Sequence, residues 1–241
     1  QTEKVTRNSM TDVVVATGTV EPVTKVDVGT QVSGIIDRIY VDYNSVVKKG
    51  QLIAEMDKVT LQAELESQEA QLANAKAEYE YQQKNYARSK VLFEKQLISD
   101  SDYEEATYNY EKAKSTYEKS KADIVKVRRN LGYAVITSPI DGVVISREVE
   151  EGQTVAAGFE TPTLFTIAKD LTEMQVIADV DEADIGEIRE GQRVTFTVDA
   201  YRNDAFEGVV TQVRLEATVE SNVVTYEVVI SAPNPDLKLK P

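Results

Sequence analysis

The chain has 241 residues, with 41 acidic and 27 basic side chains and a formal net charge of −14 at pH 7. It contains no cysteine and no histidine, which excludes thiol nucleophiles, disulfides, histidine acid–base catalysis and the usual zinc sites. The acidic balance, without a basic stripe, argues against a nucleic-acid partner. No run approaches the roughly 18 apolar residues of a membrane-spanning helix.

The first part of the chain is predicted to be β-structure. A strand is expected around residues 11–19, and apolar residues in alternation or in pairs indicate short strands from residue 26 to residue 56. The string from Glu55 to Val59 resembles the lipoyl-attachment motif of carrier domains, where a lysine at a hairpin tip takes the cofactor. Because a helical pattern begins at or just after Lys58, we interpret the string as a strand that runs into a helix, and we expect no cofactor.

A helical hairpin is predicted next, because no glycine or proline occurs between Gly50 and Gly132. Its core positions step alternately by four and three residues, as in coiled coils. In the first arm they are Leu61, Leu65, Gln68, Leu72, Ala75, Tyr79, Gln82, Tyr86, Ser89 and Phe93, and in the second Tyr103, Ala106, Tyr110, Ala113, Tyr117, Ser120, Ile124, Val127 and Leu131. Between the arms, Ser101 and Glu104 have the spacing of a capping box. The expected product is an antiparallel rod about 50 Å long.

The β pattern of residues 34–52 returns after the hairpin. Residues 141–144 again place an apolar pair after a glycine, and residues 149–155 repeat a turn of two charged residues followed by Gly-Gln. This is an internal repeat split by the rod. From about residue 171, alternating apolar residues predict an antiparallel β-barrel that includes a short capped helix between Asp181 and Gly191.

The predicted fold class is therefore mixed α and β, elongated and multidomain. It combines a β-barrel with a split lipoyl-like β-sandwich that carries an inserted antiparallel α-helical coiled-coil hairpin. The expected divisions are residues 1–22 for the first strands of the barrel region, 23–57 and 133–169 for the two lipoyl-like halves, 58–132 for the hairpin, and 170–241 for the barrel, which ends before a membrane-proximal domain.

No catalytic or metal site is expected. The carboxylates at residues 150–151 and 181–184 lack the spacing of a calcium loop and an apolar pocket, so they are interpreted as solvated turns and a helix cap. The glycines do not form a phosphate-binding pattern. We therefore expect a protein that is not an enzyme and has no ATPase activity.

The order of these units resembles the membrane fusion protein (hemolysin D-like) family of periplasmic adaptors. Residues 26–34 and 152–155 resemble the lipoyl halves of its macrolide-efflux branch, the MacA type, and residues 181–185 and 191–194 resemble the barrel of that branch. The resemblance implies an adaptor between an inner-membrane pump, favoured to be of the ABC type, and a TolC-like outer-membrane channel. It also implies a hexamer in the periplasm of a Gram-negative bacterium, attached to the inner membrane through a segment outside this sequence.

The same resemblance implies two functional regions. Family members that dock on a TolC-like channel carry Arg, Leu and Ser spaced by four and seven at the hairpin tip, and Arg88, Leu92 and Ser99 have this spacing. A surface helix that ends near an N-cap serine would have the same spacing. The loop that offers glutamine to the lumen in MacA-type proteins has Phe159 and Glu160 in this chain. Proton-driven (RND) efflux, type I protein secretion and a true lipoyl or biotinyl carrier are the alternatives.

Overall fold

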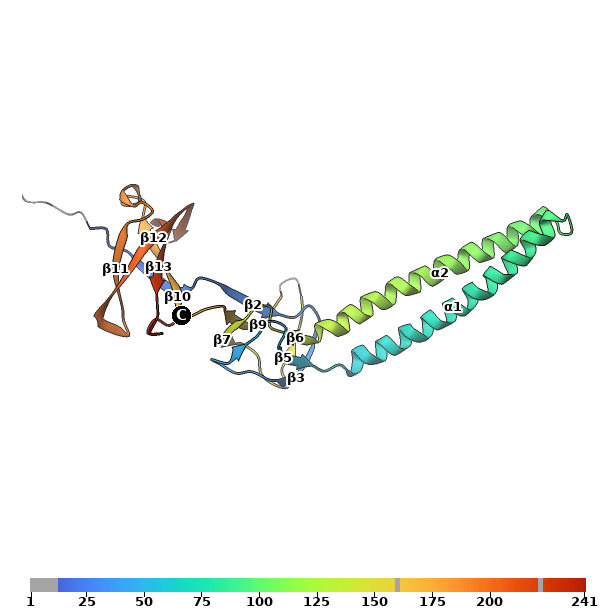
Figure 1. Ribbon diagram of the computed structural model, residues 1–241, viewed down its shortest axis with the longest axis horizontal. Coiled ribbons are helices and arrows are strands. Elements are labelled where there is room, and N and C mark those ends of the chain that lie inside the picture. Colours follow the sequence, from blue (N-terminus) through green and yellow to red (C-terminus); the bar gives the residue numbers. More distant parts are fainter. Residues whose placement is uncertain (1–12, 159–160, 221–222) are drawn as a thin grey trace, which may run out of the picture.

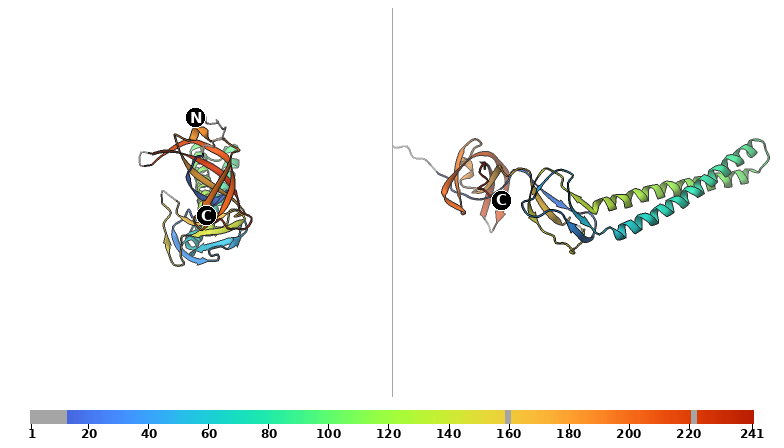
Figure 2. Two further views of the ribbon diagram at one scale, coloured as in Figure 1. Left: turned by 90° about the vertical axis from the view of Figure 1, so that its left-hand side faces the viewer. Right: turned by 60° about the horizontal axis from the view of Figure 1, so that its bottom comes forward.

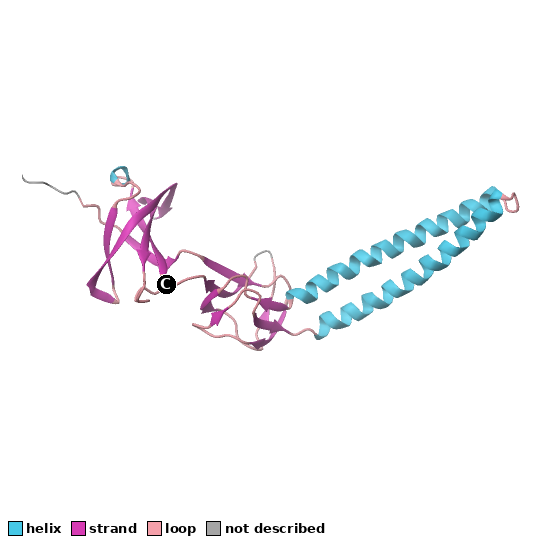
Figure 3. Ribbon diagram, in the orientation of Figure 1, coloured by secondary structure: helices cyan, strands magenta, loops and turns pink. Residues whose placement is uncertain are grey.

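The computed structural model describes residues 13–158, 161–220 and 223–241. Figure 1 shows an elongated molecule with a β-barrel unit at one end, a lipoyl-like unit in the middle and a long helical hairpin at the other end. The second view in Figure 2 shows the same order of units. This arrangement of helices and sheets confirms the predicted fold class, and Figure 3 shows that helix is concentrated in the rod.

The barrel unit is a five-stranded antiparallel sheet in the order β1-β10-β13-β12-β11. Its strands are β1 (Thr17–Pro22), β10 (Glu173–Asp181), β11 (Arg193–Val198), β12 (Tyr201–Glu220) and β13 (Val223–Pro233). The alternating burial of β10 supplies one side of a core that includes Met174, Val176 and Val180. Residues 11 and 12 of the first strand expected from the sequence lie outside the described residues, and β1 begins at Thr17.

The predicted length of the helix after Asp181 is wrong. Asp181 does accept a hydrogen bond from the backbone N–H of Ala183 at 3.1 Å, as a helix-capping residue would. Only a single 3-10 turn follows, at Ile185–Glu187. Gly186 lies within this turn, and Ile185 packs against the barrel core, so a short tethered segment replaces a full α-helix.

The lipoyl-like unit consists of two four-stranded sheets, β2-β9-β7-β4 and β6-β5-β3-β8. Before the hairpin come β2 (Lys25–Gly29), β3 (Gly34–Ile39), β4 (Val46–Val47) and β5 (Leu52–Met56); after it come β6 (Val135–Thr137), β7 (Gly142–Arg147), β8 (Thr154–Val155) and β9 (Thr163–Ala168). Each sheet therefore takes strands from both halves of the repeat. Ile36, Ile53 and Phe165 are fully buried in the shared core, so neither half can complete the core alone.

One turn is built three times in the molecule, at Lys48–Gln51, Glu150–Gln153 and Arg189–Gln192. In each turn the glutamine side-chain oxygen accepts the backbone N–H of the first residue at 2.9 Å. The glycines of the three turns have φ values of 80°, 82° and 88°, a left-handed conformation that glycine adopts without steric cost. The repeated sequence pattern thus corresponds to a repeated structure.

The rod consists of helices α1 (Val59–Glu94) and α2 (Asp100–Tyr133), with 36 and 34 residues. At about 1.5 Å per residue each helix is about 50 Å long. Every core position predicted in α1 is partly buried, and every one in α2 is partly or fully buried. Only Ala106, Ala113, Ile124 and Val127 are fully buried among the described helical residues, as a two-helix rod with a thin core requires.

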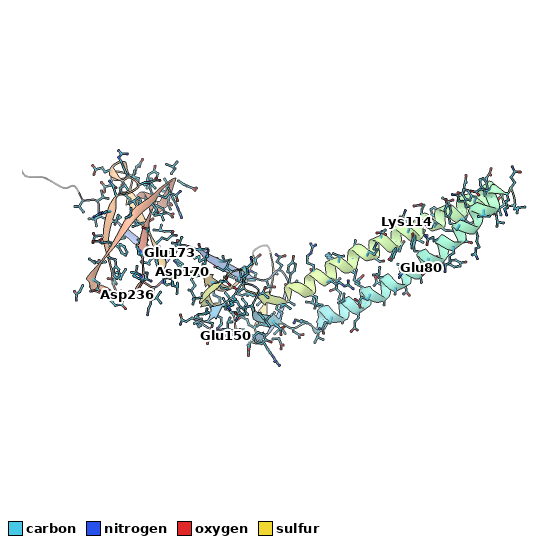
Figure 4. The ribbon with its side chains drawn as sticks, in the orientation of Figure 1. Glu80, Lys114, Glu150, Asp170, Glu173 and Asp236 are labelled. Carbon is cyan, nitrogen blue, oxygen red and sulfur yellow. The ribbon has the colours of Figure 1, made fainter. Side chains whose placement is uncertain are left out.

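The barrel and lipoyl-like units are joined by two short connecting segments, residues 23–24 and 169–172, that run side by side. The backbone N–H of Val23 donates to the carbonyl of Glu173 at 3.4 Å, and that of Lys169 donates to the carbonyl of Thr24 at 3.0 Å. Lys25 bridges to Glu21 across this junction at 2.7 Å, and this bond lowers the pKa of the Glu21 carboxyl. Figure 4 shows Asp170 and Glu173 at the junction.

Candidate functional site

The tip of the hairpin is a short reversal between α1 and α2. Gln96 has a φ of 59°, and the backbone N–H of Leu97 donates to the carbonyl of Leu92 at 2.9 Å. Helix α2 then begins behind Ser99. The free end of the rod is therefore a defined turn held by backbone hydrogen bonds.

The capping box predicted at Ser101 and Glu104 is wrong by two residues. Ser99 is the N-cap residue, and its hydroxyl accepts the backbone N–H of Asp102 at 3.2 Å. In return, the Asp102 carboxylate accepts the hydroxyl of Ser99 at 2.7 Å and its backbone N–H at 3.3 Å. These bonds lower the pKa of Asp102. Aspartate at the third helical position also interacts favourably with the helix dipole.

The structure brings two of the three predicted docking residues onto one helix face. Arg88 and Leu92 are both exposed and lie one turn apart on α1. Ser99 lies beyond the turn, and its hydroxyl is already engaged by Asp102. The side chains of Arg88 and Leu92 are therefore exposed on one face of α1, whereas the hydroxyl of Ser99 takes part in the cap of α2.

Two further apolar residues at this end were missed by the sequence reasoning. Leu97 is 66% exposed and Val91 is 49% exposed, compared with 40% for Leu92. Neither belongs to the core positions of the coiled coil, and that pattern could have identified Val91 as outward-facing. The tip thus presents a small apolar surface beside the positive charge of Arg88.

An aromatic ladder supports the tip half of the rod. Consecutive rings stack across the two helices, with centroid distances of 4.5 Å between Phe93 and Tyr103, 5.0 Å between Tyr86 and Tyr110, and 5.4 Å between Tyr79 and Tyr117. Additional contacts of 6.0 Å and 5.9 Å link these pairs into one series. The ladder keeps the tip in a fixed relation to the middle of the rod.

Lys58 lies at the root of the rod, where the lipoyl-like strand β5 meets α1. Helix α1 begins at Val59, and the Lys58 ammonium donates to Glu55 at 2.7 Å. The Tyr40 hydroxyl donates to the same carboxylate at 3.0 Å. Together, led by the bond from Lys58, these contacts lower the pKa of Glu55. Lys58 thus lies in a strand-to-helix junction instead of the β-hairpin tip of a carrier domain.

Two candidate residues lie beyond the part of the chain that the structure describes. Phe159 and Glu160, expected in a loop facing a lumen, lie outside the described residues. Within the described ranges, no group of three metal-ligating side chains is present. No helix in those ranges is both long enough and apolar enough to cross a membrane.

Comparison with known proteins agrees with this architecture. Residues 24–167 match the model of the RND membrane fusion protein barrel-sandwich hybrid domain, and residues 174–241 match the YknX-like β-barrel domain. The macrolide export protein MacA of Yersinia pestis is 33% identical over all of this chain and 68% of its own length. The pyoverdine export membrane fusion protein PvdR of Pseudomonas putida is 36% identical over 98% of this chain and 68% of its own length.

A solved structure shows the same likeness in three dimensions. The crystal structure of MacA from Actinobacillus actinomycetemcomitans has a TM-score of 0.77 and 34% identity, over 94% of this chain and 74% of that one. A split lipoyl-like unit that carries a free helical hairpin, with a β-barrel on its other side, defines an adaptor. The chain belongs to the membrane fusion protein family.

Proposed function

We propose that this chain is the periplasmic adaptor of a tripartite efflux pump, attached to the inner membrane of a Gram-negative bacterium. The observation that carries the proposal is the rod of about 50 Å, which projects from the lipoyl-like unit and ends in a defined tip. Such a rod can reach from a pump in the inner membrane toward a channel in the outer membrane. The adaptor has no catalytic role in this proposal.

The tip is the end that meets the TolC-like channel. Arg88 supplies a cation and Leu92 an apolar side chain on one face of α1, a combination that suits a groove between partner helices. Ser99 shapes the turn through its hydrogen bonds with Asp102. Docking therefore depends on Arg88 and Leu92 directly and on Ser99 through the geometry of the reversal.

An ABC-type transporter is the inner-membrane partner that the likeness to MacA favours, because residues 26–34, 152–155, 181–185 and 191–194 resemble the MacA branch of the family. Six copies would form a ring in which the lipoyl-like units surround a duct. An RND partner is the second candidate, supported by the match of residues 24–167 to a domain model of RND adaptors.

A strain that lacks its own adaptor tests the function. The full-length protein, expressed with the transporter encoded beside its gene and with a TolC-like channel, is expected to restore drug resistance or substrate export. The matched control replaces Val59–Tyr133 with a short glycine-rich linker, which leaves the lipoyl-like strands connected but removes the rod. Export that is equal with and without the rod would contradict an adaptor that bridges two membranes.

The intact mass of the protein after expression in a lipoylating host distinguishes an adaptor from a lipoyl carrier. Lys58 is held by Glu55 at a helix start, so we expect an unmodified mass. A mass raised by one lipoyl group would assign this chain to the carrier class instead.

A further inference from the structure

Two turns of the lipoyl-like unit have the same structure and opposite charge. Lys48–Gln51 and Glu150–Gln153 share the glutamine–backbone bond and the left-handed glycine. The first turn presents two lysines, and the second presents two glutamates, at the same two positions. All four charged residues are exposed. The repeat therefore conserves the shape of the turn while it inverts the charge.

The two turns lie beside opposite edge strands of one sheet, the first at the ends of β5 and β6 and the second at the ends of β3 and β8. The backbone of Lys48–Gln51 bonds to Ser138, directly after the edge strand β6, through Gly50 N–H at 2.7 Å and Ser138 N–H at 2.9 Å. Glu150–Gln153 leads directly into β8, and β8 is the other edge of the sheet β6-β5-β3-β8. The unit thus has a basic edge at β6 and an acidic edge at β8.

A carboxylate fixes each turn, but Asp141 lies outside the first turn, whereas Glu151 belongs to the second turn. Asp141 accepts the backbone N–H of Lys49 at 2.8 Å, and Glu151 accepts the backbone N–H of Ile39 at 2.9 Å. Within the described part of the chain, Lys48 and Lys49 belong to no ion pair, whereas Glu150 bonds to Arg147 at 2.8 Å. The ammonium groups of Lys48 and Lys49 are therefore available to a partner.

The net charge at each edge keeps its sign after the neighbouring groups are included. At the β6 edge, two lysines against Asp141 leave +1. At the β8 edge, Glu150, Glu151 and Asp42 against Arg147 leave −2, because Asp42 also lies 3.3 Å from Arg147. Figure 4 shows Glu150 at the surface of the lipoyl-like unit.

We propose that these edges bind each other between copies of this chain, with the Lys48–Lys49 turn of one copy against the Glu150–Glu151 turn of the next. The contact is head-to-tail, because its two surfaces differ, and repetition of a head-to-tail contact around an axis closes a ring. This inference rests on the proposed function insofar as it names the contact that builds the adaptor ring. Opposite charges also suppress the wrong edge-to-edge pairings.

Site-directed cross-linking tests the contact, because the chain has no cysteine of its own. Thr137 on β6 and Thr154 on β8 are exposed and lie at the two edges. Two full-length variants, Thr137→Cys and Thr154→Cys, are made with different tags and treated with a short thiol cross-linker in cells. We expect a cross-linked product when the two are co-expressed and none when either is expressed alone.

Charge reversal then tests whether attraction between the two turns causes the contact. Lys48→Glu/Lys49→Glu, placed in both cysteine variants, is expected to reduce the mixed product at least tenfold, whereas Lys95→Glu at the distant rod tip leaves it unchanged. Unaltered thermal melting of the reversed variant excludes misfolding. A reversed variant that cross-links as well as the parent would overturn the electrostatic contact.

The outcomes separate this inference from the proposed function. The head-to-tail contact is overturned if the cysteine variants restore export but give no mixed product. It is also overturned if cross-links form only between copies of the same variant. Both outcomes leave the adaptor role intact. If the unmodified protein restores no export, the adaptor role fails, and cross-linking of the purified chains alone decides the contact.

Discussion

The hydroxyl oxygens of Tyr86 and Tyr103 lie 3.2 Å apart across the seam of the rod, within hydrogen-bonding distance. Their rings are also stacked, with centroids 6.0 Å apart. Tyr86 stacks in addition on Tyr110, so it is the central ring between the tip and the middle of the rod. The shared hydrogen bond raises the pKa of Tyr86.

Replacement of Tyr86 by leucine is expected to loosen the tip half of the rod. The change removes two ring contacts, each worth about 0.5 to 1.5 kcal/mol, and the hydrogen bond to Tyr103, worth about 1 kcal/mol, so the free energy of unfolding should fall by about 2 to 4 kcal/mol. Tyr86→Phe is the control, because it keeps both stacked contacts and loses only a hydrogen bond of about 1 kcal/mol. Urea unfolding followed by circular dichroism measures both, and equal losses would show that the stacking contributes nothing.

The cap of α2 predicts a pH dependence. Hydrogen bonds from Ser99 lower the pKa of Asp102 in the folded chain. A lowered folded pKa gives stability that is present above the unfolded value of about 3.9 and is lost as the pH falls through the folded value. The protection of the tip amides against hydrogen exchange, taken relative to their intrinsic exchange rates at each pH, should therefore decrease below about pH 4, and Asp102→Ala should remove this component.

Ser99→Ala tests the same cap without a titrating group. Loss of an N-cap serine costs about 1 kcal/mol, so hydrogen exchange in the first turn of α2 should accelerate about fivefold at pH 7. Ser101→Ala is the matched control, because Ser101 lies inside the first turn. A larger effect at Ser101 would restore the capping box expected from the sequence.

The sequence allowed the rod to be predicted almost residue by residue, because a coiled-coil seam is a local pattern. Every core position from Leu61 to Leu131 that was expected from spacing is partly or fully buried. The cap was misplaced because two serines compete within three residues, and each has an acidic residue three positions later. Only the three-dimensional turn decides between Ser99 and Ser101.

The arrangement of the lipoyl-like unit depends on contacts between residues far apart in the sequence. The repeat was recognisable in the sequence, but the way its halves share both sheets was not, since β3 pairs with β8 and β4 pairs with β7 across more than 90 intervening residues. For the same reason, the opposite edges occupied by the lysine and glutamate turns could not be predicted. The role of Arg88, Leu92 and Ser99 in docking stays a prediction.

Two glycines separated by ten residues should respond in opposite directions to alanine. A Cβ at Gly142 would lie 2.1 Å from the carbonyl oxygen of Ala168, which is backbone and cannot move away cheaply. Gly132 lies in α2 with nothing within 4 Å of its Cβ position. We expect Gly142→Ala to lower the melting temperature markedly and Gly132→Ala to add up to about 1 kcal/mol of stability. Equal effects would contradict the close strand packing at Gly142.

Charge and shape at the rod tip give the prediction closest to function. Arg88→Asp and Leu92→Asp are each expected to abolish export, because they place a carboxylate on the face of α1 that we propose meets the channel. Lys90→Asp and Ala87→Asp are the matched controls: they reverse a charge or place a carboxylate at an apolar position, at exposed sites of α1 that are not three or four residues from Arg88 or Leu92. Export is measured as drug resistance, and circular dichroism checks that each rod remains helical. If both row variants retain resistance equal to the parent, the tip assignment is wrong, and if the controls fail as well, the whole end of the rod, instead of one face, forms the docking surface.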